Sequence, residues 1–408
     1  MATVDTSVKE LIINKLTQEQ YDNLAEKSST ELYFVTDAEM LPDQTGNAGK
    51  FLQTDGENLS WENALVNNAT DASSIHIGTN KTTGDGYENV VIGPQAQAQG
   101  LQIYRNVVLG AGAIGWGDNS VAIGTEAEAS KNTFMGGNAI SVGAYTKANG
   151  GNAVAIGSSA KADADDSIAI GSTNTQATGK NAIAVGKGAI AKGENAIVIG
   201  NNALSNSSEG ANVVIGPGSK VDGYSFNSTA IGIDTQATDY DATAIGRSST
   251  AGAQYSVAIG HSAVTNSDCV DDSDTTDFPS TLALGMNAHS RSNSTIAIGK
   301  AVYADGPYST VIGYKSTVEE GCVKGISIGS EAQVVGSEGI AVGNTAKSSR
   351  HGIALGTRAK VNEFGGVAIG LNTDSSATNA VTIGNQSYAR GGNSVALGGS
   401  AVVDYGAD

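Results

Sequence analysis

The stretch NVVLGAGAIGWG at residues 106–117 carries the clearest chemical signal in the sequence. Its glycines, Gly110, Gly112 and Gly115, have the spacing G-x-G-x-x-G of a dinucleotide-binding turn. In such a turn the third glycine opens a helix whose N-terminal N–H groups bind the pyrophosphate. Here the next strand-like run, Ser120 to Ile123, begins five residues after Gly115, so no helix fits. The sequence therefore predicts no dinucleotide site.

Other candidate groups lack the partners that their chemistry needs. GKGAIAKG at 186–193 imitates a phosphate loop but lacks the terminal Lys-Ser/Thr and the helix. Cys269 and Cys322 lack the paired spacing of a zinc site. The four histidines lie in different repeats, without a second ligand at a fixed offset, and are expected to be exposed turn residues: His76, His261, His289 and His351. We therefore expect no catalytic residue, no metal and no cofactor, although a carboxylate pair formed across neighbouring repeats stays open.

One acidic segment departs from the regular spacing described below. NSDCVDDSDTTDFP at 266–279 makes the interval between Gly260 and Gly285 eleven residues longer than normal. Clustered carboxylates could bind a hard cation, but the spacing is not that of an EF-hand and a solvated acidic loop is the simpler interpretation. Insertions in repeat proteins often form the binding face, so we expect receptor contact from Asp268, Asp271, Asp272, Asp274 and Phe278.

The element that positions all these residues is a repeat. An apolar tetrapeptide ending in glycine, such as VAIG at 121–124, recurs 22 times, and 12 of the 21 intervals between these glycines share the same 14-residue length. The residue before each glycine is Ile, Val or Leu, and the residue between the two apolar positions is Ala in 13 copies. The clearest repeat positions are Ile123, Gly124, Ile156, Gly157, Ile170, Gly171, Ile199 and Gly200.

Each 14-residue unit divides into strand, turn, strand and turn. A strand this short buries its apolar face only if equivalent strands stack, which gives a parallel β-solenoid with a rise of ~4.8 Å per coil. Irregular spacing would have indicated an antiparallel sandwich, and heptads a coiled coil. Gly110 is the third repeat glycine, so the dinucleotide-like motif is part of this pattern.

Alternation places the Ala and the Val or Ile side chains on opposite faces of the first strand. Both faces are apolar, and one of them fills the thin interior of the coil. We expect the Ala face to meet a partner chain, because small side chains permit close approach, with the reverse assignment as the alternative. Either assignment leaves one apolar face uncovered in a monomer, so a trimer is expected.

The N-terminal residues do not follow the repeat. Possible capping boxes at Ser7 and Thr17 predict two short helices, followed by a strand at Leu32 to Val35. Asp55-Gly56 lies between alternating runs and predicts a hairpin. We expect a small α/β module for docking at 1–40, a neck at 41–74 and a repetitive shaft with a distal tip at 75–408.

Composition narrows the choice of partners. The net charge of −18 disfavours nucleic acid and anionic membrane surfaces. The start MATVDTSVKELIINKLTQEQ lacks a signal-peptide pattern, and no run approaches the ~18 apolar residues that a membrane helix needs. We expect the chain to be synthesised in the cytosol and not to insert into a membrane.

The repeat units NSVAIGTEAEAS (119–130) and NAIAVGKGAIAKGENAIVIG (181–200) resemble the head domain of trimeric autotransporter adhesins. This resemblance covers roughly residues 75–400 and implies a trimeric left-handed parallel β-roll. In contrast, KLTQEQYDNLAEKSSTELYFVTD (15–37) and GKFLQTDGENLSW (49–61) are similar to N-terminal pieces of tailed-phage fibre proteins. That second resemblance implies a virion fibre, assembled in the host cytoplasm and attached through residues 1–40 to other virion proteins.

The expected function is that of a non-enzymatic homotrimeric phage fibre that attaches to a host-surface glycan or protein. Two alternatives stay open at this point. One is an enzymatic tailspike that degrades surface glycan, and the other is a decorative capsid (head) fibre or spacer.

Overall fold

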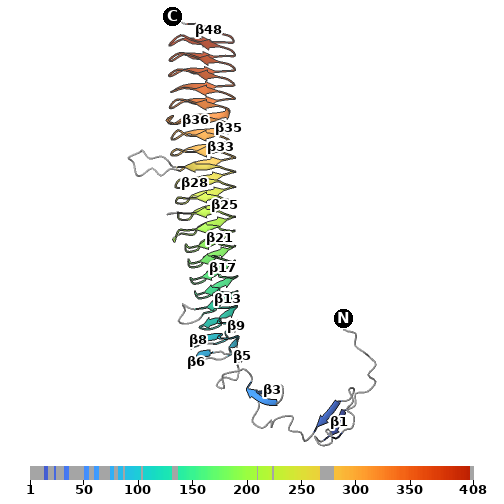
Figure 1. The fold of residues 1–408 in the computed structure, drawn as a ribbon. Coiled ribbons are helices and arrows are strands. Elements are labelled where there is room, and N and C mark those ends of the chain that lie inside the picture. Colours follow the sequence, from blue (N-terminus) through green and yellow to red (C-terminus); the bar gives the residue numbers. More distant parts are fainter. Residues whose placement is uncertain are drawn as a thin grey trace, which may run out of the picture.

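The computed structural model describes residues 74–404 apart from 78–80, 86–87, 103, 131–136, 209, 223–224 and 267–279, and before them 13–16, 23, 32–35, 50–54 and 59–63. Within these residues every regular element is a strand. The coils stack in chain order from β5 to β48 into a rod (Figure 1). Val154 of one coil pairs with Ile168 of the next, so the predicted parallel β-solenoid with 14-residue coils is confirmed.

Each coil contributes one strand to each of two parallel sheets. In one coil Val154–Ile156 (β15) lies in the first sheet and Lys161–Ala162 (β16) in the second sheet. The first turn, which starts at the repeat glycine, leads from the first sheet to the second, and the second turn leads to the next coil. Equivalent residues pair in register, as Val154 does with Ile168 and Lys161 with Gln176. The two turns therefore form the two opposite edges of the rod.

The strands of the first sheet are β5 (Ile75–Ile77), β7 (Val90–Ile92), β9 (Val107–Leu109), β11 (Val121–Ile123), β13 (Ile140–Val142), β15, β17 (Ile168–Ile170), β19 (Ile183–Val185), β21 (Ile197–Ile199), β23 (Val213–Ile215), β25 (Thr229–Ile231), β27 (Thr243–Ile245), β29 (Val257–Ile259), β31 (Leu282–Leu284), β33 (Ile296–Lys300), β35 (Thr310–Tyr314), β37 (Ile326–Ser330), β39 (Ile340–Val342), β41 (Ile353–Leu355), β43 (Val367–Ile369), β45 (Val381–Ile383) and β47 (Val395–Leu397).

The strands of the second sheet are β6 (Lys81–Asp85), β8 (Gln97–Gln102), β10 (Ile114–Trp116), β12 (Glu128–Ala129), β14 (Lys147–Ala148), β16, β18 (Gln176–Ala177), β20 (Ile190–Ala191), β22 (Leu204–Ser205), β24 (Lys220–Val221), β26 (Gln236–Ala237), β28 (Thr250–Gly252), β30 (Val264–Asn266), β32 (His289–Ser290), β34 (Tyr303–Ala304), β36 (Thr317–Val318), β38 (Gln333–Val334), β40 (Lys347–Ser348), β42 (Lys360–Val361), β44 (Asp374–Ser375), β46 (Tyr388–Ala389) and β48 (Val402–Val403).

The interior of the coil is filled by small side chains. In the coil of β15 and β16 the inward residues Ala153, Ala155, Ala160 and Ala162 are all 0% exposed. The expectation that the Ala face meets a partner chain is therefore wrong, and the alternative is confirmed in placing the Ala side chains inside the coil. The physical reason is the small width of the coil, since the two sheets approach too closely for larger side chains in most coils.

The repeat glycine is required by the stacking of the first turns. Gly157 has φ +113°, and a Cβ there would collide with the backbone carbonyl of Gly171 in the next coil. Gly398 has nearly the same conformation, φ +117°, but a Cβ there would meet no atom within 4 Å. A side chain at Gly157 would add both a collision and an unfavourable φ, whereas a side chain at Gly398 would add only the unfavourable φ.

We expect Gly157→Ala to lower the free energy of unfolding by more than the roughly 1–3 kcal/mol that the unfavourable φ alone costs. The matched change Gly398→Ala should cost less, because only the unfavourable φ is added. Thermal melting of both variants measures the difference. Equal losses of stability would contradict the steric argument.

The structure also explains the dinucleotide-like motif. Gly110 starts a first turn, and Gly115 is an inward residue of β10 whose Cβ would lie 2.8 Å from Val108 Cγ2. The following strand, β11, pairs directly with β9. No helix lies between them, as the sequence predicted.

The N-terminal residues form two small sheets in the described part. Ile13–Leu16 (β1) pairs in parallel with Leu32–Val35 (β2), the strand that the sequence predicted. Lys50–Thr54 (β3) and Leu59–Asn63 (β4) pair antiparallel on either side of Asp55-Gly56, so the expected hairpin is present. The segments expected to form two helices lie outside the described residues apart from Asn23, which is a turn residue. The small α/β module therefore remains a prediction in its helical part.

Candidate functional site

The second-turn edge is where the shaft departs most from its regular spacing. The acidic excursion joins β30 to β31 there, and the interval between Gly124 and Gly143, five residues longer than normal, is lengthened between β12 and β13. Asn266 and Ser280 are the described residues on either side of the acidic excursion. Asp268, Asp271, Asp272, Asp274 and Phe278 lie outside the described residues, so their contact with a receptor remains a prediction.

The repeat residues identified in the sequence lie at the ends of first-sheet strands and at the starts of first turns. Ile123, Ile156, Ile170 and Ile199 each end a strand of the first sheet with the side chain directed outward. The glycines after them, Gly124, Gly157, Gly171 and Gly200, start first turns at positive φ. Together with the residue at the start of each strand, these side chains give the first sheet an outward surface of Ile, Val, Leu and Thr, which we call the apolar face.

The histidines do not share one environment. His261 is an exposed turn residue and His351 is a half-buried turn residue that lies 3.1 Å from a Glu338 carboxylate oxygen. The expectation of an exposed turn position is wrong for the other two. His76 is 3% exposed because it takes the inward position that is usually Ala, and His289 is an outward residue of strand β32.

Aromatic residues occupy the second turns before the acidic excursion. The Phe226 and Tyr240 rings lie in neighbouring coils with centroids 4.9 Å apart. In the next coil Tyr255 is 47% exposed and has φ +54°, and its N–H donates to the Tyr240 carbonyl at 2.9 Å. We call these three residues the aromatic flank. The position of Tyr255 is held by Asn, Asp or Ser in many other coils, as by Asn152, Asp166 and Ser294.

Beyond the excursion lies a cluster of polar and aromatic side chains. The His289 and Tyr303 rings stack at 4.9 Å with an interplanar angle of 6°. The guanidinium of Arg291 lies 5.6 Å from the centre of the Tyr303 ring, its Nη2 lies 3.4 Å from His289 Nδ1, and its Nη1 lies 3.8 Å from Asp305 Oδ1. We call His289, Arg291, Tyr303 and Asp305 the charged flank. Its two cross-coil pairs, His289 with Tyr303 and Arg291 with Asp305, each join equivalent positions of adjacent repeats.

The charged flank also contains shifted titratable groups. Burial, and then the Arg291 charge, lower the pKa of His289, which favours the neutral imidazole. Burial raises the pKa of Asp305, with Arg291 acting against this shift and Glu320 adding to it. Burial and then Glu319 raise the pKa of the nearby Cys322 thiol. All three groups lie in consecutive coils, and shifted pKa values tend to gather at functional sites.

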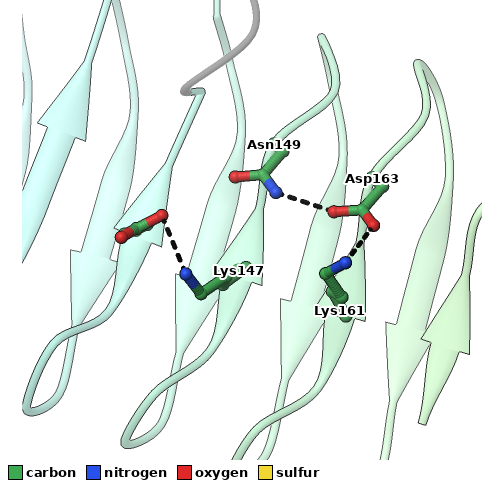
Figure 2. Close-up of polar contacts among 5 residues, drawn as sticks. Lys147, Asn149, Lys161 and Asp163 are labelled. Atoms are coloured by element: carbon green, nitrogen blue, oxygen red, sulfur yellow. Dashed lines mark hydrogen bonds and ion pairs between the residues drawn. The ribbon is translucent and has the colours of Figure 1, made fainter. Parts of the chain in front are cut away.

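The residue that directly follows each strand of the second sheet occupies what we call the ladder position. In Figure 2, Asn149 at this position donates to Asp163 at the same position of the next coil at 2.7 Å, while Lys147 lies 3.3 Å from the carboxylate of Glu128. Arg390 and Asp404, also at ladder positions, form an ion pair at 2.8 Å. Arg291 and Asp305 occupy ladder positions as well, but their atoms stay farther apart.

The described residues contain neither a metal-binding cluster nor a membrane-spanning helix. In the described part of the chain no group of three or more His, Cys, Asp or Glu side chains could hold a metal ion. Nor does that part contain a helix with the length and apolar character needed to cross a membrane.

The sequence pattern missed the charged flank. The available signal was the offset of one repeat length between His289 and Tyr303 and between Arg291 and Asp305, which places each pair side by side once the repeat is aligned. The repeat spacing does not predict the distance between the Arg291 and Asp305 side chains.

Comparison with known families supports an adhesin-like fold. The model of the YadA head domain repeat, which spans two copies of the repeat, matches residues 116–146, 136–160, 148–174, 177–203, 225–249, 240–263 and 375–401. Such repeats are structural domains of adhesins, are typically non-enzymatic, and belong to head domains that are trimeric. No curated protein sequence matches the chain. The coils of this rod are thus similar to YadA head repeats, and the chain is a YadA-head-like repeat protein with the architecture of an adhesin-like structural fibre.

Proposed function

We propose that the chain is a homotrimeric fibre of a phage virion that attaches to the host surface. The observation that carries this proposal is a long β-solenoid whose coils stack in chain order and are similar to adhesin repeats. A solenoid extends by adding coils, and each coil contacts only its neighbours, so loops can change without loss of the rod.

The apolar face supports the homotrimer. Ile170 and Ile199 are 37% and 40% exposed in the single chain, and similar aliphatic side chains follow one another along the first sheet. A contiguous exposed apolar surface of this extent indicates an interface. The trimeric head domains of the matched family supply the copy number, so we infer that two further copies of the chain cover this face.

The placement in a virion rests on the N-terminal resemblance to phage fibres. In this proposal residues 1–40 dock to other virion proteins, and residues 75–408 form the shaft that extends outward. Assembly takes place in the host cytoplasm before the particle is released.

Removing the acidic excursion is expected to reduce adhesion without loss of folding. A variant in which residues 266–277 are replaced by a normal turn should keep its melting temperature, because β29 and β31 already pair as neighbouring coils. Its binding to cells should fall if the excursion contacts the receptor. Removal of the distal residues 402–408 is the matched comparison, because the tip is the competing binding location. If the variant without the excursion bound cells as well as the wild-type protein, the excursion would not be the receptor-binding segment.

The attachment function is tested with the purified full chain on a panel of bacterial strains. Flow cytometry of the labelled protein should show saturable binding to at least one strain, and mass spectrometry of the supernatant should show no released oligosaccharide. Release of sugar would establish an enzymatic tailspike instead. Binding to none of the strains that support the phage would favour a decorative or spacer fibre.

A further inference from the structure

We propose that the charged flank is a binding subsite for a neutral saccharide. This inference deepens the attachment function proposed above and rests on it. It adds a contact with the ligand on the described coils beyond the excursion.

Arg291 and Asp305 lie farther apart than the polar pairs at the ladder positions of other coils. Arg390 Nη1 and Asp404 Oδ1 are 2.8 Å apart, and Asn149 donates to Asp163 at 2.7 Å. Arg291 Nη1 and Asp305 Oδ1 are 3.8 Å apart, and this buried carboxylate oxygen has no hydrogen-bond partner among the described residues. A buried acceptor without a partner is costly, which favours any turn of the partly exposed Asp305 carboxylate toward a donor.

The two side chains are both partly exposed, 49% for Arg291 and 25% for Asp305. The Asp305 carboxylate can accept from a donor, whereas the Arg291 guanidinium carries N–H donors. A hydroxyl group can play both parts, since it can donate to Asp305 and accept from Arg291. An ammonium group would be repelled by Arg291, and a phosphate or carboxylate group would be repelled by Asp305 and by Glu320, which interacts electrostatically with it. The pair therefore selects a neutral ligand rich in hydroxyl groups.

An aromatic surface formed by His289 and Tyr303 lies beside this pair. The stacked His289 and Tyr303 rings span two coils of the second sheet next to Arg291. Aromatic side chains provide apolar contact area with a polar edge, which suits the C–H groups and hydroxyls of a sugar ring. His289 also stays neutral more readily than usual, because burial and Arg291 lower its pKa. The cluster lies on the opposite side of the rod from the apolar face and stays accessible when further copies cover that face.

The proposal is tested with the full chain on an array of immobilised oligosaccharides that are neutral, N-acetylated or anionic. The wild-type protein should bind neutral or N-acetylated chains and should bind uronic-acid or sulfated chains less. Asp305→Asn and Arg291→Gln should each weaken this binding about tenfold, a change of about 1.4 kcal/mol. The matched controls Asp404→Asn and Arg390→Gln alter a closed pair at the same ladder position and should leave binding unchanged.

Three outcomes would overturn the proposal: no bound oligosaccharide, a preference for anionic chains, or equal losses in the Asp305 and Asp404 variants. Binding of an unstructured peptide in place of oligosaccharides would likewise overturn it. The thermal melting curves of all four variants ensure that folded proteins are compared. Wild-type protein that adsorbs to cells but ignores the array would retain the attachment function and remove only this subsite, whereas failure to adsorb to any cells would count against the function itself.

Discussion

Ala184→Arg is expected to destabilise the shaft by at least about 3 kcal/mol. Ala184 is the middle residue of β19, is 0% exposed, and lies between Ala169 and Val198 of the adjacent coils. An arginine there brings a charge into the apolar interior and also exceeds the space between the two sheets. Thermal or urea unfolding followed by circular dichroism measures the loss.

The control for Ala184→Arg lies on the same coil. Ile190 is an outward residue of β20, at a position that holds Lys161 and Lys220 in other coils. Ile190→Arg should therefore change stability much less. If Ala184→Arg melted at the wild-type temperature, the assignment of the Ala side chains to the coil interior would be wrong.

The second large effect is expected from charges on the apolar face. Ile170→Asp combined with Ile231→Asp places two carboxylates among the outward aliphatic side chains of the first sheet. Full burial of one such isoleucine is worth about 1.5–3 kcal/mol, and a trimer contains three copies of each. We expect the double variant to dissociate into monomers that keep their β structure.

Light scattering and circular dichroism together read out this result. Gln176→Asp with Gln236→Asp is the matched control, because these residues lie outward on the second sheet of the same two coils. The control should remain assembled. An assembled Ile170/Ile231 variant, or dissociation of both double variants, would contradict an interface on the apolar face.

The regular part of the fold could be predicted because its period is visible in the sequence. A glycine once per repeat and two alternating apolar positions, such as Val154 and Ile156, specify a stacked strand and a turn. Alternation does not say which face lies inside, so the expectation that Ala155 faces a partner chain is wrong. The narrow space between the two sheets, which favours Ala155 and still admits Val198, decides which face lies inside.

The charged flank could be predicted only in part. Aligning residues one repeat length apart places Arg291 beside Asp305 and likewise Arg390 beside Asp404. The sequence pattern is the same in both cases, yet one pair is closed at 2.8 Å and the other is open at 3.8 Å. That difference depends on three-dimensional packing, which an alignment of the repeats does not contain.

The central claim, that the chain is a virion fibre with its shaft directed outward, is tested most directly by immunogold electron microscopy. Antibodies against residues 75–408 are applied to intact phage particles whose genome encodes the chain. We expect gold label on fibres that extend from the particle. The label should lie away from the point at which the N-terminal residues attach. Unlabelled particles, together with label on the envelope of the bacterial cell, would contradict the account.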